Sequence, residues 1–352
     1  PAGPPGGILR SEPLARAPAG ATAFRILYRS RGQDDTPVAL SALLFVPVRP
    51  APADGRSVVA LTHGTVGIAR GCAVSRGRAF LPHVDGLRRF VDAGYAVVAP
   101  DYEGLGTRGP HPYLVGVTSA RATLDAVRAT RRFAPAGASQ RFVAWGVGQG
   151  GHTALFTGQE AGAYAPELEL AGVAAAAPYA NIGRLVGAAA DTTAGRVVAG
   201  YTLASWSRVY PQVRLDAILD GRSRERVEAL ARSCVPVDHG PIAAALGNLD
   251  VMLAYRTRDP WAAEPLKGLL ARNAPGAKPI PVPVIITQGA DDRLVRASST
   301  ARFVRHLCSE GTTVQYRRSR AVAHTDVGEK TAPYVSKWIV GRFAGESARS
   351  TC

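Results

Sequence analysis

Residues 141–151 read Arg-Phe-Val-Ala-Trp-Gly-Val-Gly-Gln-Gly-Gly, and this stretch decides how the rest of the chain is interpreted. Its first part, Phe142–Trp145, is a short apolar run typical of a buried strand. Four glycines follow within six residues, and the segment from His152 to Glu160 then has the composition of a helix. The sequence therefore predicts a buried strand that ends in a tight turn, with a helix leaving that turn.

This strand, turn and helix match the nucleophile elbow of α/β-hydrolases, whose motif is Gly-x-Ser-x-Gly, at every position except the central one. Gly146 and Gly150 occupy the two flanking positions, where the turn is too cramped for side chains. The central residue is Gly148, so the nucleophilic hydroxyl of the motif is missing. The remaining sequence decides whether the other parts of a hydrolase site are present.

Apolar runs that alternate with helical patterns lie on both sides of this turn. Strands are predicted at residues 23–29, 38–48, 57–62, 95–100, 142–145, 171–177, 283–287 and 313–317. Helices are predicted at residues 87–93, 119–133, 152–160, 298–307 and 332–343. The first two strands favour an antiparallel hairpin, and the alternation that follows favours a mainly parallel sheet with helices on both faces.

A long stretch without strand patterns interrupts this alternation. About a hundred residues separate the strands at 171–177 and 283–287, which is too many for a loop. Helical patterns occur there at residues 182–190, 197–206, 224–231 and 242–255. We therefore divide the chain into an extended N-terminal arm at 1–22, an α/β-hydrolase core at 23–180 and 280–352, and an inserted helical cap at 181–279.

Several apolar residues of the inserted segment allow two interpretations. They could line an acyl-sized pocket beneath the cap, or they could only pack the inserted helices against one another. These residues are Val198, Leu203, Trp206, Leu246 and Met252.

Basic residues outnumber acidic ones, 42 to 27, and the formal net charge is +15. A charge of this size can indicate a nucleic-acid or anionic partner. The arginines are, however, spread through every segment and form no dense tract with interleaved aromatic residues. We therefore expect a solvated basic surface and no nucleic-acid partner. No apolar stretch approaches the roughly 18 residues that a membrane helix needs.

Two segments near the end of the chain carry an acid and a base in the order that a hydrolase triad requires. The strand at 283–287 leads into Gln288-Gly-Ala-Asp-Asp-Arg-Leu-Val, where Asp292 fits the acid and Asp291 is the fallback. His324 follows the next predicted strand, on a loop where the general base belongs. We expect Asp292 to orient His324, and His324 to face position 148.

Acyl transfer also needs hydrogen-bond donors for the oxyanion that develops on the carbonyl. One donor is the N–H of the residue after the nucleophile position, which is Gln149. The other comes from the loop after an earlier strand. His63-Gly64-Thr65 directly follows the strand at 57–62, so the N–H of Thr65, together with its hydroxyl, is the candidate. We expect His63 itself to take no part in the chemistry.

With these residues in place, the chain resembles the secretory lipases, a lipase-A-like family of α/β-hydrolases, in their bacterial branch. The resemblance covers almost the whole chain and departs from the family pattern at Gly148. The segments that carry it are Leu61-Thr-His-Gly-Thr-Val-Gly-Ile-Ala with Cys72 close behind, Gly94-Tyr-Ala-Val-Val-Ala-Pro-Asp-Tyr-Glu-Gly-Leu-Gly-Thr, Asp125-Ala-Val-Arg-Ala, Trp145-Gly-Val-Gly-Gln-Gly-Gly-His and Gln288-Gly-Ala-Asp-Asp.

The resemblance implies a secreted protein that hydrolyses carboxylic esters, and because the sequence starts at Pro1 without Met we expect its signal peptide to have been removed. It also implies a small-molecule ester or lipid substrate, transient contact with a lipid surface, a helical cap, and no metal or organic cofactor. The four cysteines alone allow three pairings. The resemblance favours Cys72–Cys234, which would join the oxyanion loop to the cap, and Cys308–Cys352.

Gly148 leaves three main interpretations of the activity, and a polyanion-binding protein is a remote fourth. We favour an esterase or lipase with a Ser-Asp-His triad, present here as an engineered inactive form, because glycine tolerates the strained backbone of the elbow and the other parts remain. The second interpretation is a natural pseudoenzyme that binds lipids or acyl compounds. The third is an enzyme in which His324 activates water or another acceptor directly, and an acyltransferase belongs to this chemistry.

Overall fold

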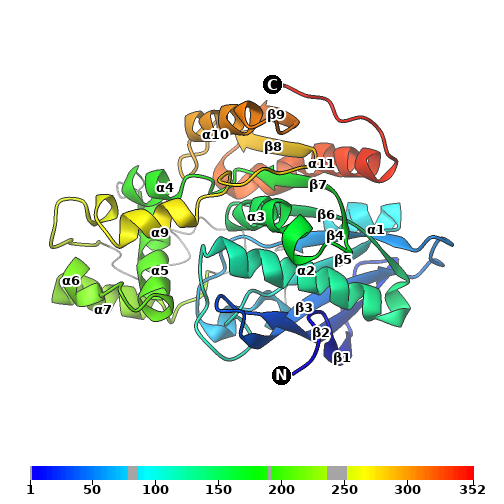
Figure 1. Cartoon of the computed structure of the whole chain (residues 1–352), viewed down its shortest axis with the longest axis horizontal. Helices are drawn as coiled ribbons and strands as arrows, with labels where there is room; N and C mark the ends of the chain where they lie inside the picture. Colours follow the sequence, from blue (N-terminus) through cyan, green and yellow to red (C-terminus); the bar gives the residue numbers. More distant parts are fainter. Residues whose placement is uncertain (1, 78–85, 189–191, 236–251) are drawn as a thin grey trace.

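The computed structural model describes residues 2–77, 86–188, 192–235 and 252–352. Its framework is a nine-stranded sheet with the order β1-β2-β3-β5-β4-β6-β7-β8-β9, which runs from the lower to the upper part of Figure 1. The strands are β1 Ile8–Leu14, β2 Ala21–Arg31, β3 Pro37–Pro47, β4 Arg56–Thr62, β5 Ala96–Pro100, β6 Ala138–Val147, β7 Glu169–Ala176, β8 Val284–Gly289 and β9 Val314–Ser319.

Strand direction divides this sheet into two parts. β1, β2, β3 and β5 pair antiparallel in that order, and β5, β4, β6, β7, β8 and β9 pair parallel. The residues of β5 and β8 are buried throughout, as expected for parallel strands that helices cover on both faces. The predicted fold class, an α/β-hydrolase with a mainly parallel sheet, is confirmed, and so is the antiparallel pairing of β2 with β3.

Helices cover both faces of the sheet. Leu155 of α3 and Phe303 of α10 share an apolar cluster with Ala144 of β6, whereas Val335 of α11 packs in the cluster that holds Val143 and Trp145. Successive residues of β6 therefore point to opposite layers. The helices outside the insertion are α1 Leu87–Ala93, α2 Gly116–Arg132, α3 Gln149–Tyr164, α10 Ala297–Ser309 and α11 Val327–Phe343, with short 3-10 turns η1 Arg70–Cys72, η2 Val74–Arg76, η4 Ala134–Ala136 and η7 His324–Asp326.

A helical segment lies between β7 and β8, on the left of Figure 1. Its elements are α4 Ile182–Ala188, α5 Thr193–Val209, α6 Leu215–Ile218, α7 Gly221–Leu230, η6 Pro260–Ala262 and α9 Leu266–Arg272. Most of the helix predicted at 242–255 lies outside the described residues, and residues 252–255 are not helical.

The apolar residues that were considered for a pocket in this segment differ in their surroundings. Val198, Leu203 and Trp206 are fully buried in the main apolar core, and Trp206 Nε1 donates to the carbonyl of Tyr113. Met252 is 56% exposed, and Leu246 lies outside the described residues. The three buried side chains thus join the inserted helices to the core.

The N-terminal segment differs from the extended arm predicted at 1–22. Within it, β1 pairs antiparallel with β2 from Ile8 to Leu14 and forms one edge of the sheet. Backbone hydrogen bonds between Gly6 and Arg29 and between Arg29 and Gly7 continue this pairing. An edge strand is held by its backbone and leaves much of its side-chain surface in solvent, so it needs no apolar alternation that a sequence pattern could reveal.

Two disulfides join parts of the chain that are distant in sequence, and they are the pairs that the resemblance implies. Cys72–Cys234 links the segment after β4 to the segment after α7, where Val235 N–H also donates to the carbonyl of Val66. Cys308–Cys352 fastens the C-terminus to the end of α10. All four cysteines are therefore oxidised.

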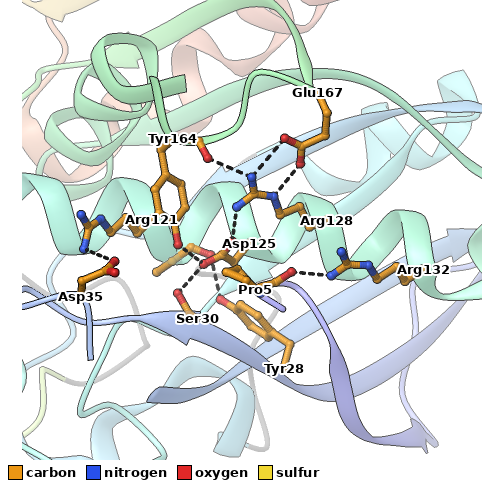
Figure 2. Close-up of polar contacts among 11 residues, drawn as sticks. Pro5, Tyr28, Ser30, Asp35, Arg121, Asp125, Arg128, Arg132, Tyr164 and Glu167 are labelled. Carbon is orange, nitrogen blue, oxygen red and sulfur yellow. Dashed lines mark hydrogen bonds and ion pairs between the residues drawn. The ribbon is translucent and has the colours of Figure 1, made fainter. Parts of the chain in front are cut away.

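A buried ionic cluster around Asp125 of α2, which we call the Asp125 cluster, joins α2 to β2 and to the end of α3 (Figure 2). The Asp125 carboxylate accepts hydrogen bonds from Ser30 Oγ at 2.7 Å, Tyr164 Oη at 2.9 Å and Arg128 Nη1 at 2.8 Å. Arg128 also binds Glu167 through Nε at 2.6 Å. The Asp125 side chain is fully buried, so its charge depends on these partners.

We predict that Asp125→Asn lowers the free energy of unfolding by about 3 kcal/mol, because it removes the buried partner of Arg128. Urea denaturation monitored by circular dichroism measures this loss. Glu167→Gln is the matched control, since the Glu167 side chain is 46% exposed, and it should cost less than about 1 kcal/mol. Equal losses from the two variants would show that the Asp125 cluster does not carry the stability assigned to it.

Candidate active site

Gly148 is the single residue between the end of β6 and the start of α3. The two flanking glycines are required by close packing against β4. A Cβ atom on Gly146 would lie 2.2 Å from Thr62 Oγ1, and one on Gly150 would lie 1.9 Å from the carbonyl oxygen of Thr62. The turn is therefore as cramped as its sequence predicts, and only glycine fits on either side of position 148.

The backbone at Gly148 has φ 58° and ψ −113°, a region that L-residues rarely adopt. A Cβ atom built on this residue would lie 3.2 Å from His324 Nε2 and 3.2 Å from Tyr179 Cε1. A side chain at position 148 would therefore point at the imidazole of His324, although the residue present has none.

Asp292 and His324 form a hydrogen-bonded pair next to this position. Asp292 lies on the loop after β8, His324 begins the 3-10 turn after β9, and His324 Nδ1 is 2.7 Å from Asp292 Oδ2. Because a carboxylate only accepts hydrogen bonds, Nδ1 is the donor, and Nε2 faces position 148. The fallback residue, Asp291, is exposed, and the structure does not bring its side chain to His324.

The Asp292 carboxylate is held from several sides. Its Oδ1 accepts hydrogen bonds from the N–H groups of Leu294 at 2.9 Å and Val295 at 2.7 Å. Its Oδ2 accepts a further bond from Gln288 Nε2 at 3.2 Å. The Asp292 side chain is completely buried, whereas that of His324 is 16% exposed. Asp292 is thus a fixed acceptor that is hydrogen-bonded to a partly accessible imidazole.

The two backbone groups expected to bind an oxyanion have no partner within the described residues. Gln149 is the first residue of α3, so its N–H has no acceptor one turn earlier. The N–H of Thr65 also makes no hydrogen bond within the described part of the chain. The Thr65 hydroxyl is already engaged, since its Oγ1 lies 2.7 Å from Tyr113 Oη. The backbone N–H of Thr65 is therefore available as a donor, and in the contact of its hydroxyl with Tyr113 either oxygen can donate.

Sequence reasoning missed Tyr179, which borders this site. Its N–H donates to the carbonyl of Gly148 at 3.1 Å, and its ring stacks on His324 with centroids 5.8 Å apart. Burial raises the pKa of Tyr179, so the phenol stays neutral. Its position could have been noticed, because Pro178-Tyr179 closely follows β7, the strand next to β6.

Three other histidines near the elbow are buried and neutral. His63 Nδ1 lies 2.7 Å from the carbonyl oxygen of Gly64, His111 Nδ1 lies 2.8 Å from that of Glu103, and His152 Nε2 lies 2.7 Å from that of Asn273. Burial lowers the pKa of His63 and His152 to about 4 and that of His111 to about 3. They therefore act as structural hydrogen-bond donors at neutral pH.

The lowered pKa values of these three histidines predict that the folded protein loses stability on mild acidification. Well above pH 6.5 the three imidazoles are neutral in both the folded and the unfolded protein. As the pH falls towards 4, these histidines bind protons in the unfolded chain, whereas in the folded chain they stay mostly neutral because their pKa values are lower. The free energy of unfolding should thus fall over this range, by at most about 3 kcal/mol for His152. In urea titrations between pH 7 and 4.5, His152→Gln should show a shallower dependence on pH. An unchanged slope would contradict the assignment.

Known proteins similar to this chain include lipases and an esterase. The family model for secretory lipases matches residues 86–351. Lipase A of Arthroderma benhamiae is 24% identical over 269 residues, covering 74% of this chain and 56% of that protein. A protein of Mycobacterium tuberculosis named "Probable inactive lipase MT1628" is 24% identical over 375 residues, covering 97% of this chain and 79% of that protein.

Solved structures support the same fold. Candida antarctica lipase A superposes with a TM-score of 0.82 at 18% identity, covering 99% of this chain and 84% of that one. The cell-wall-degrading esterase LipA of Xanthomonas oryzae superposes with a TM-score of 0.79 at 20% identity, covering 97% and 98%. At these identities the likeness concerns the fold and not the substrate.

Proposed function

The chain belongs to the secretory lipase family, and from this we propose that its site is that of a secreted carboxylic-ester hydrolase in which Gly148 stands in place of the serine nucleophile. In this proposal His324 is the general base, Asp292 orients it, and the N–H groups of Thr65 and Gln149 bind the oxyanion. The observation that carries the proposal is the direction of position 148, whose Cβ would face His324 Nε2 at 3.2 Å.

Without an Oγ at position 148, the chain cannot form an acyl-enzyme by the usual route. Loss of a triad nucleophile typically lowers turnover on the order of a millionfold. The oxyanion donors and the imidazole do not depend on that oxygen. We therefore expect the chain to bind an ester with its carbonyl oxygen on the two N–H groups and to hold it uncleaved.

The inserted helices support a proposal about the ligand. We assign α4–α9 to a cap over the edge of the sheet that carries Gly148, with a small-molecule ester or a lipid beneath it. Two disulfides and membership of a secretory family favour an oxidising, extracellular location. No helix of the described residues is long and apolar enough to span a membrane.

The origin of Gly148 has two candidate explanations. The surroundings of Gly148 are those that a single serine-to-glycine change would leave, which favours an engineered inactive form. The mycobacterial relative named as a probable inactive lipase favours a natural member without turnover, which would bind esters or lipids as its function. Both explanations assign the same ligand-binding residues.

We predict that Gly148→Ser raises the hydrolysis of aryl esters by several orders of magnitude and allows labelling by a serine-directed phosphonate, because the base and the oxyanion donors are in place. Gly148→Ala is the matched control, since it adds the same Cβ without a hydroxyl. Both variants should lose about 1–3 kcal/mol of stability, because either side chain must adopt the strained backbone of the elbow. A folded serine variant without activity or label would refute the proposal.

The roles of the acid and the base are tested in the serine variant. His324→Ala should abolish the recovered activity, and Asp292→Ala should reduce it strongly, because the imidazole then loses its fixed acceptor. Asp291→Ala is the matched control for the acid, since its side chain is exposed, and it should cost much less. Equal losses from the two aspartate variants would remove Asp292 from the triad. An alcohol added as a competing acceptor would reveal acyl transfer as a second product.

A further inference from the structure

A cavity of about 100 Å³ lies beside the proposed triad, and three arginines line it. Arg184 comes from α4, and Arg293 and Arg296 come from the loop between β8 and α10. Asn181 and Ser298 add polar groups, and none of the lining residues is acidic. We call this site the arginine cavity.

The arginine cavity lies at the same edge of the sheet as Gly148. Its walls are the loops that follow β7 and β8, and these strands are the next two beyond β6 in the parallel part of the sheet. Ligands of open α/β sheets bind at this carboxyl edge. With neighbouring strands about 4.8 Å apart, the gap between β7 and β8 lies roughly 7 Å from the end of β6. One small ligand can therefore reach both places.

Tyr179 borders both places. The residue is part of the lining of the arginine cavity, and its Cε1 would lie 3.2 Å from a Cβ at position 148. The cavity also borders the residues that hold the acid of the proposed triad. Thr300 lines it and donates to Gln288 Oε1 at 2.6 Å, and Gln288 in turn donates to Asp292.

The described residues supply no carboxylate to neutralise the charge of the arginine cavity. None of the three arginines makes a salt bridge to a carboxylate of the described residues. The first turn of α10, a helix of 13 residues that begins at Ala297, adds positive electrostatic potential at the cavity. Guanidinium groups bind planar oxyanions through paired hydrogen bonds. The chemistry of the cavity is therefore that of a site for a carboxylate or a phosphate.

We propose that the arginine cavity binds a carboxylate or phosphate group that the ester ligand carries roughly 7 Å from its ester carbonyl. The substrate class is thus an anionic ester, and the cavity selects it over neutral esters of the same shape. This inference rests on the proposed function, because it places the ester carbonyl at position 148.

The test uses two esters of equal shape and different charge. In Gly148→Ser, kcat/KM is measured for 4-acetoxybenzoate, whose carboxylate lies para to the ester, and for the neutral 4-acetoxybenzamide. We expect a preference of roughly tenfold or more for the anion, which Arg184→Gln and Arg296→Gln each reduce about fivefold. Arg302→Gln is the matched control, because Arg302 is exposed on α10 but does not line the cavity, and it should leave the preference unchanged.

Direct binding separates this inference from the proposed function. The chain with Gly148 is titrated with 4-acetoxybenzoate and, separately, with inorganic phosphate, using calorimetry. Binding of either anion that weakens in Arg184→Gln and Arg296→Gln but not in Arg302→Gln supports the inference, even if the serine variant is inactive. If the serine variant hydrolyses both esters equally, or if the arginine variants bind both anions as the parent does, the arginine cavity is not an anion site.

Discussion

The contact of β4 with the turn after β6 is the constraint on which the site depends. Thr62 Oγ1 lies 3.0 Å from the carbonyl oxygen of Trp145 and 2.8 Å from that of Gly150, so its single O–H is shared between them. The two segments are so close that neither Gly146 nor Gly150 could carry a Cβ. The chain must therefore reverse within one residue, and Gly148 takes up that reversal with its positive φ. The start of α3, and with it the N–H of Gln149, is fixed by the same contact.

The sequence was most informative for residues that directly follow a strand, because the strand pattern places them at a known edge of the sheet. The glycines of the elbow, the acid after β8 and the histidine after β9 could be located because each follows a strand, and parallel strands end at one edge. The sheet class followed from the alternation of strands and helices for the same reason. The elbow glycines, Asp292 and His324 can be located from the strand that each one follows, and the order of strands can be read from the sequence.

The features that the sequence did not reveal depend on contacts across the chain. β1 is held by backbone hydrogen bonds at an edge, so Ile8–Leu14 carries no apolar periodicity. Tyr179 borders the site through a ring stacked on His324, and stacking leaves no pattern in the sequence. The arginine cavity combines Arg184 with Arg296, which lie more than a hundred residues apart and meet only because β7 and β8 are neighbours.

The tight turn around Gly148 and the Asp292–His324 pair have different physical causes. Gly146 and Gly150 are required by packing against Thr62, so any chain with this sheet would need them, whether or not it catalyses a reaction. The Asp292–His324 pair is not required by packing in this way. A buried carboxylate costs free energy, and the imidazole that it orients is partly exposed and faces an empty position.

A pair of this kind is better explained by chemistry or ligand binding at position 148 than by stability. The backbone N–H groups of Leu294 and Val295 would hold a carboxylate at position 292 without any histidine. His324 therefore adds orientation towards Gly148 and little to the core. The direction of His324 Nε2 towards position 148 is what the proposed hydrolase site would use.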